Sequence, residues 1–273
     1  MSSILRPTPA QTTRRFVVMA STLFAILVGY GQMAGGWGQT AAEFAADSDA
    51  TLKVAGYAFS IWGVIYLGLL IYAVRQVLPQ TGESDMINRF GWLSVVALLG
   101  IGLWIVASAA DWEVATIVII FASLLALLVP LVVYSGLIRS LPNKDRDRWM
   151  TLWPLSLLAG WLTVAAPLNL ITVLTGNNAL PAGLPPTVWA MLAIAVVVVV
   201  ALAVTQRIRT VAYALPIAWG LIGAFVAELD RNPTLAFFAL AAAIAVLIGA
   251  VILTLRLRPG IERDTPLARH PRA

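Results

Sequence analysis

The chain of 273 residues contains no cysteine and only one histidine, His270. The absence of cysteine excludes disulfide bonds, iron–sulfur ligation and thiol chemistry, and one histidine excludes a metal site built from clustered imidazoles. Charged residues are also scarce, since they make up 11% of the chain, whereas soluble proteins carry about 25%. So few charges cannot cover the surface of a water-soluble enzyme or supply a nucleic-acid interface, and both classes are excluded.

Hydrophobic residues, in contrast, make up 60% of the chain and give it a mean hydropathy of +0.88. A helix needs about 20 apolar residues to cross the hydrocarbon core of a bilayer. Segments of this kind occur at 16–36, 55–78, 90–110, 114–138, 149–174, 186–206, 210–228 and 233–256. Their apolar runs are continuous, whereas the strands of a membrane barrel alternate. We therefore predict an all-α integral membrane protein with about eight transmembrane helices.

The basic residues indicate the orientation of these segments. If the N-terminus is cytoplasmic, 16 of the 18 Lys and Arg residues lie on the cytoplasmic side, and only Lys53 and Arg231 lie outside. Cytoplasmic loops of membrane proteins are enriched in Lys and Arg, so both termini are predicted to be cytoplasmic. The pair Arg14-Arg15 before the first apolar run also resembles the flank of a signal peptide. No convincing cleavage site follows it, and we expect the first helix to be retained.

Ionisable residues are nearly absent from the membrane interior. No Lys or Arg lies at the centre of a predicted span, although pumps and ion-coupled carriers usually keep ionisable groups there. Ion-coupled transport is therefore disfavoured. Glu228, at the end of the seventh segment, has two interpretations: a residue at the outer interface, which we favour, or a member of a proton relay.

Eight of the ten tryptophans form two groups. One group falls at span ends, where tryptophan is a typical interfacial anchor: Trp37, Trp112, Trp149 and Trp189. The other group lies deeper within the spans: Trp62, Trp104, Trp161 and Trp219. The deeper group raises the question of a pocket inside the membrane.

The spacing of aromatic and amide residues favours such a pocket. Phe59, Trp62 and Tyr66 share one face of the second span, and Trp161 and Asn169 share one side of the fifth. Prolines interrupt the fifth span and favour an opening between helices. Flat aromatic faces with a few polar groups suit a large, planar, apolar ligand with polar edges. The alternative interpretation is ordinary packing of tryptophan-rich helices, with no ligand.

Two stretches of sequence resemble a known family. Residues 55–66, AGYAFSIWGVIY, are similar to the second-helix signature of the TspO/MBR family, the translocator proteins or tryptophan-rich sensory proteins, with Trp62 and Tyr66 in the W-x-x-x-Y spacing. Residues 160–169, GWLTVAAPLN, resemble its fifth-helix W-x-x-x-A-x-x-x-N pattern. Trp104 stands where the family usually has a tryptophan in its third helix.

The chain also departs from the family pattern. Ser60 replaces the proline that follows Phe59, and Ile101 replaces the asparagine three residues before the third-helix tryptophan. Leu157-Leu158 stands in place of a Pro-Tyr pair, and the first loop lacks the expected proline-rich lid. These departures concern the ligand more than the fold.

The resemblance implies a division of the chain. It predicts a cytoplasmic segment over 1–13, a TspO-like five-helix bundle over 14–178 and three additional transmembrane helices over 179–256. Residues 257–273 are predicted to form a basic, disordered tail. The sixth and eighth spans are rich in Ala and Val, which favours close helix packing, either onto the five-helix unit or in a homodimer.

The resemblance further implies a cavity that opens towards the outer loops and holds a tetrapyrrole, protoporphyrin or haem, or a sterol-like lipid. The expected role is that of a membrane sensor or binding protein in the bacterial cytoplasmic (inner) membrane, with the lipid bilayer and the hydrophobic ligand as partners and no required cofactor. Catalysis is not expected, although some members are reported to degrade porphyrin in light. By the resemblance, the pocket is lined by Trp62, Tyr66, Trp104, Trp161 and Asn169, to which helical geometry adds Tyr57 and Phe59.

Two other functions stay open from the sequence. A transporter of a small apolar solute requires alternating access, but five helices followed by three show no pair of matching halves. A non-catalytic scaffold or assembly subunit requires no small ligand at all. Neither nucleic acid nor a metal ion is an expected partner.

Overall fold

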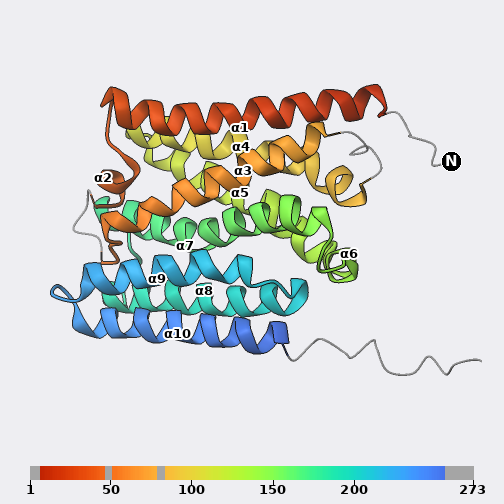
Figure 1. The fold of residues 1–273 in the computed structure, drawn as a ribbon. Coiled ribbons are helices and arrows are strands. Elements are labelled where there is room, and N and C mark those ends of the chain that lie inside the picture. Colours follow the sequence, from red (N-terminus) through yellow and green to blue (C-terminus); the bar gives the residue numbers. More distant parts are fainter. Residues whose placement is uncertain (1–6, 47–50, 79–83, 256–273) are drawn as a thin grey trace, which may run out of the picture.

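The computed structural model describes residues 7–46, 51–78 and 84–255, and every regular element within these ranges is a helix (Figure 1). Eight helical segments are long and apolar enough to cross a membrane, and each overlaps one predicted span. The prediction of an all-α membrane protein is therefore confirmed. The side of the membrane on which the termini lie stays a prediction, and the predicted tail over 257–273 lies outside the described residues.

The first half of the chain forms four spans. They consist of α1 (Pro9–Gly35), η1 (Gly56–Ser60) with α3 (Ile61–Val77), α4 (Asp85–Ala109) and α5 (Glu113–Val133). Two short helices accompany them: α2 (Ala41–Ala46) in the first loop and α6 (Ser135–Ser140) after α5. These four spans form one side of the bundle (Figure 1).

The second half forms the other four spans. They consist of the π-helical turn η3 (Arg148–Leu152) with α7 (Trp153–Gly176), α8 (Pro186–Ile208), η4 (Val211–Tyr213) with α9 (Ala214–Glu228), and α10 (Pro233–Leu255). α10 packs against both α8 and α9, so the Ala- and Val-rich spans contact the rest of the bundle. Outward-facing residues such as Val199 stay exposed, and a homodimer stays a prediction.

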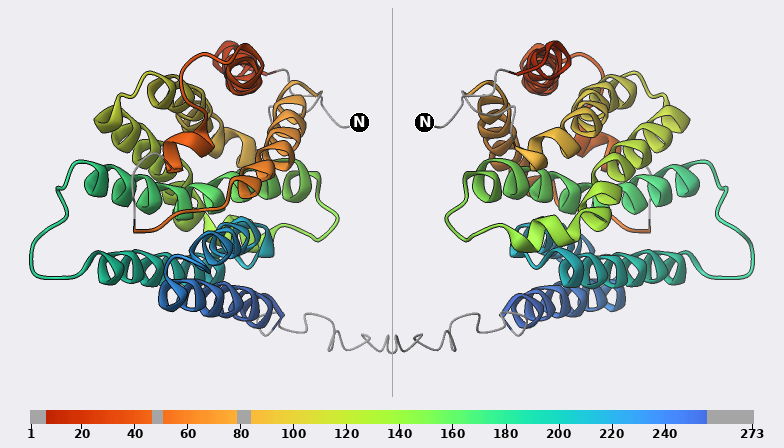
Figure 2. Two further views of the ribbon diagram at one scale, coloured as in Figure 1. Left: turned by 90° about the vertical axis from the view of Figure 1, so that its left-hand side faces the viewer. Right: turned by 90° about the vertical axis from the view of Figure 1, so that its right-hand side faces the viewer.

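α7 is the central helix of the fold. It contacts α3 and α5 on one side and α8, α9 and η4 on the other, and Figure 2 views the bundle along the helix axes with α7 between the two groups. Sixteen of its 24 residues are buried. Of the last three helices, α8 and α9 therefore cover α7 directly, and the predicted division of the chain stays a prediction.

Two element boundaries differ from those expected. α1 begins at Pro9 because the Thr8 hydroxyl accepts a hydrogen bond from the Gln11 amide while the Gln11 side chain accepts one from the Thr8 amide, which is a capping box. Arg14 and Arg15 consequently belong to the helix. α5 ends at Val133, and Tyr134 leaves the helix before α6 starts.

Gly160 permits a close contact between α7 and η4, because a Cβ there would overlap the backbone carbonyl of Tyr213. We expect Gly160→Ala to lower the free energy of unfolding by about 1–3 kcal/mol through overpacking. Gly63→Ala is the matched control, since a Cβ at Gly63 meets nothing within 4 Å. Thermal unfolding in detergent measures both variants, and equal midpoints would contradict this packing.

Candidate ligand-binding site

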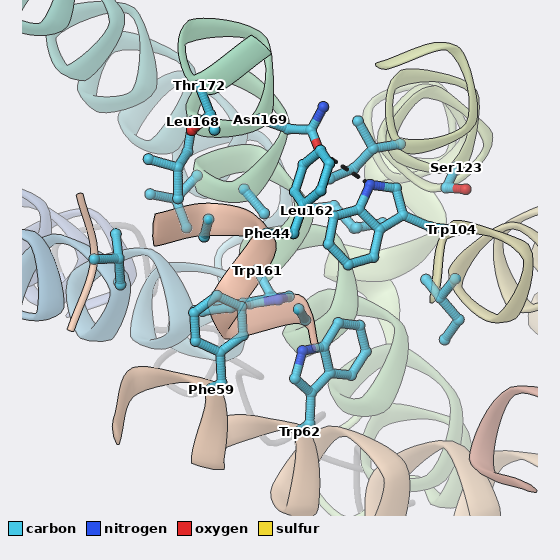
Figure 3. A pocket seen from close by; sticks show the side chains of 18 residues that line it. Phe44, Phe59, Trp62, Trp104, Ser123, Trp161, Leu162, Leu168, Asn169 and Thr172 are labelled. Atoms are coloured by element: carbon cyan, nitrogen blue, oxygen red, sulfur yellow. Dashed lines mark hydrogen bonds between the residues drawn. The ribbon is translucent and has the colours of Figure 1, made fainter. Parts of the chain in front are cut away.

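A hollow lies between α7 and the helices α2, α3, α4 and α5, near the end of the bundle where α2 is found (Figure 3). It contains about 700 Å³ of space free of atoms, part of which is open to the exterior. Aromatic side chains from five elements line it: Phe44 of α2, Phe59 of η1, Trp62 of α3, Trp104 of α4 and Trp161 of α7.

The aromatic rings contact one another edge to face. The Trp161 ring centre lies 5.9 Å from that of Phe59 and 6.3 Å from that of Trp62, at interplanar angles of 79° and 78°. Phe44 and Trp104 form a second pair at 5.7 Å and 82°. Edge-to-face pairs of this kind are favourable, so the rings hold one another in fixed orientations around the hollow.

One buried amide organises the polar part of the site. The Trp104 indole Nε1 donates to Asn169 Oδ1 at 3.1 Å, and Asn169 Nδ2 donates to the Thr116 hydroxyl at 3.0 Å. The Thr116 hydroxyl in turn donates to the Glu113 carbonyl at 2.6 Å. This chain of hydrogen bonds joins α4, α5 and α7 and fixes the plane of the Trp104 ring.

The indole N–H groups of the other two tryptophans of the hollow take no part in such a chain of hydrogen bonds. Neither Trp62 Nε1 nor Trp161 Nε1 has a hydrogen-bond acceptor within the described part of the chain, and neither nitrogen is sealed from the surface. The hollow therefore offers two indole N–H groups to a ligand. The described residues that line it include no ionisable side chain.

The structure brings together five of the seven residues expected at the site. Phe59, Trp62, Trp104, Trp161 and Asn169 all line the hollow. Tyr57 and Tyr66 are not among its lining residues. Contact of any of these residues with a ligand stays a prediction.

Tyr57 and Tyr66 lie elsewhere for geometric reasons. Residues 56–60 form a 3₁₀ helix, so Tyr57 points away from Phe59, is 45% exposed and packs on Trp219 at 5.6 Å. Tyr66 faces α1, where its hydroxyl lies over Gly29 and its ring lies 5.6 Å from Tyr30.

Phe44 was not predicted as a site residue, because the first loop lacks the proline-rich lid and was not expected to contribute to the pocket. A Thr-x-x-Glu capping box was the available signal: the Thr40 amide donates to Glu43 Oε2 at 2.6 Å, and the Glu43 amide donates to the Thr40 hydroxyl at 3.2 Å. These hydrogen bonds lower the pKa of the Glu43 carboxyl below its usual value. They are therefore present at neutral pH and are lost as the pH falls through that pKa.

Sequence reasoning also missed the contribution of α9. Gly220 lines the hollow, where a Cβ would lie 2.8 Å from Val164 and 3.5 Å from Trp161. α9 further holds the backbone that leads to Phe59. Trp219 Nε1 donates to the Ala58 carbonyl at 2.8 Å, and the Ala55 amide donates to the Gly223 carbonyl at 3.0 Å.

Glu228 completes this attachment at the end of α9. Its Oε1 accepts hydrogen bonds from the Lys53 amide at 2.7 Å and from Arg231 Nη1 at 3.0 Å, and the residue is 1% exposed. Both partners lie in loops, and the carboxylate joins the α9–α10 turn to the segment before η1. This arrangement supports the interpretation of Glu228 as a residue at the interface.

The eight apolar helices show that this is an integral membrane protein. The aromatic hollow inside the bundle fits a membrane protein that binds a ligand. The model of the TSPO-like protein family matches residues 15–252, and the chain belongs to this family. The predicted resemblance to the TspO/MBR family is thereby confirmed. The match extends from α1 into α10 and so includes the last three helices. No curated protein and no solved structure gives a significant match to the chain.

Proposed function

We propose that the protein binds a planar hydrophobic ligand in the aromatic hollow and acts as a membrane sensor or binding protein. The observation that supports this most directly is the convergence of five aromatic side chains from five elements on one hollow, whose lining within the described ranges has no ionisable residue. Such a lining favours binding over acid–base catalysis. The predicted cytoplasmic termini and the location in the bacterial inner membrane belong to the same proposal.

A tetrapyrrole fits the chemistry of the hollow better than a sterol-like lipid. The flat rings of Trp62 and Trp161 can stack on a planar macrocycle, and their unpaired N–H groups can donate to carboxylate groups at its edge. A sterol offers one hydroxyl and an aliphatic face, which use neither feature fully. Binding requires no resident cofactor, and light-driven breakdown of porphyrin by the tryptophans is a secondary outcome for the same site.

The test is a titration of purified protein with protoporphyrin, followed by the absorption band of the porphyrin against protein-free micelles. Wild type is expected to saturate, and Trp161→Ala is expected to bind about tenfold more weakly, because it loses two edge-to-face contacts and a stacking surface. The matched control is Trp112→Phe, which changes a tryptophan that is 61% exposed and lies outside the hollow.

Two results would count against this function. Spectral changes that never saturate, or that are the same for Trp161→Ala and wild type, would show that porphyrin enters only the micelle. Concentrative uptake of the ligand into sealed proteoliposomes would show a transporter instead of a sensor.

A further inference from the structure

A second site is indicated at the opposite end of α4 from the hollow, where an arginine is buried without a counterion among the described residues. Arg14, in the second turn of α1, is 3% exposed. Its side chain crosses Gly91 of α4, where a Cβ would overlap its Cδ and come within 2.7 Å of its Nε. Gly91 therefore provides the space in which the guanidinium lies between α1 and α4.

Only one side of this guanidinium is satisfied. Nη1 donates to Asn88 Oδ1 at 2.9 Å, whereas Nε and Nη2 are buried and have no hydrogen-bond partner among the described residues. Nε and Nη2 share one edge of the planar group, and this edge binds carboxylate or phosphate oxygens in a bidentate manner. The geometry thus leaves free the edge that recognises an oxyanion.

No acidic side chain in the described ranges pairs with Arg14, since the ion pairs found there are Arg75–Asp147 and Arg231–Glu228. Tyr72 and Ser94, which share a hydrogen bond of 2.7 Å, are neutral and cannot balance this charge. A buried charge without a counterion is strongly unfavourable. Arg15 has the same two nitrogens, Nε and Nη2, buried and unpaired. This region therefore has unbalanced positive charge that an anion would neutralise.

The depth of Arg14 in the membrane indicates where the anion comes from. α1 has 27 residues and is about 40 Å long, which exceeds the hydrocarbon thickness of about 30 Å. Arg14 lies about 8 Å along the helix from Pro9, close to the boundary between hydrocarbon and headgroups. Lipid phosphates lie at this level, and anionic lipids attract basic residues there.

We propose that Arg14, supported by Asn88 and Arg15, binds the phosphate of an anionic phospholipid between the first turns of α1 and α4. The site is distinct from the aromatic hollow, since Asn88 and Trp104 are separated by about 24 Å along α4. Arg14 holds the phosphate through its free edge, while Asn88 orients the guanidinium from the opposite side. The bound lipid thereby links α1 to the bundle.

The test compares the full-length protein in nanodiscs of phosphatidylcholine alone and of phosphatidylcholine with phosphatidylglycerol. Phosphatidylglycerol should raise the midpoint of thermal unfolding and should stay bound to the released protein in native mass spectrometry. Arg14→Gln is expected to weaken this retention about tenfold or more, since it removes a charge-assisted bidentate contact. Arg139→Gln is the control, because Arg139 is exposed and donates to the Arg207 carbonyl.

Further variants and lipids make each outcome decisive. Arg14→Lys keeps the charge but loses the bidentate edge, so intermediate retention supports the proposal. If Arg14→Gln does not fold, Gly91→Ala displaces the same side chain without changing the charge and should reduce retention. Equal retention of both lipids by wild type would overturn the proposal. Release of the lipid by millimolar inorganic phosphate would show that the site takes a soluble oxyanion, which would overturn its assignment to lipid.

Discussion

A chain that ends at residue 178 is expected to lose porphyrin binding, although it contains the entire five-helix unit predicted from the sequence. Truncation removes Gly220 from the wall of the hollow and exposes the face of α7 that carries Trp161. It also removes Trp219 and Glu228, which hold the backbone before Phe59. Two aromatic residues of the hollow thus lose their support at once.

We expect affinity to fall by at least about a hundredfold, which corresponds to about 3 kcal/mol. The same porphyrin titration measures it. Coexpression of residues 179–273 as a separate chain is the control, because transmembrane helices that insert independently can associate in the bilayer, and it should restore binding. Full affinity of the truncated chain alone would show instead that the first five helices form a complete binding domain.

Asn169→Leu, which keeps the branching and the number of heavy atoms of the side chain, is expected to have the second largest effect. The substitution leaves the Trp104 indole N–H without its acceptor and the Thr116 hydroxyl without its donor partner. An unsatisfied buried donor costs about 1–3 kcal/mol, so the free energy of unfolding should fall by that amount. Because the Trp104 ring loses its fixed plane, porphyrin affinity should also fall about tenfold.

A double substitution separates the two effects. Trp104→Phe combined with Asn169→Leu removes both partners of the hydrogen bond, and such replacements can be nearly neutral. The double variant should therefore recover much of the thermal stability without recovering porphyrin affinity. Simple addition of the two single effects on stability would contradict a direct coupling between these side chains.

The spans were predictable because lipid imposes length and hydropathy on each helix independently of its neighbours. The helix ends were less predictable because they depend on local capping. The capping box formed by Thr8 and Gln11 makes α1 longer than expected and places Arg14 within the helix. The position of the last three helices was not predictable in the same way. α7 is covered on several sides, so its sequence has no apolar stripe that would indicate where α9 packs.

The site was predictable where residues recur in a family motif on one helix face, as with Trp62, Trp161 and Asn169. Tyr66 obeys the same spacing but faces α1, because a motif fixes neighbours along a helix and not the helix that packs against each side. Phe44 and Gly220 reach the hollow from segments far apart in the chain. Contacts of that kind depend on the tertiary fold, and no local sequence pattern predicts them.

The hydrogen bond between Lys53 and Glu228 joins residues 175 positions apart, and this has a consequence for biogenesis. During synthesis, α7 enters the membrane before the helix that will cover Trp161 has been made. The segment before Phe59 likewise cannot form its hydrogen bond with Glu228 until the α9–α10 turn has emerged from the ribosome. A nascent chain therefore carries these tryptophans in the bilayer without a closed hollow around them until α9 and the turn that follows it have been made.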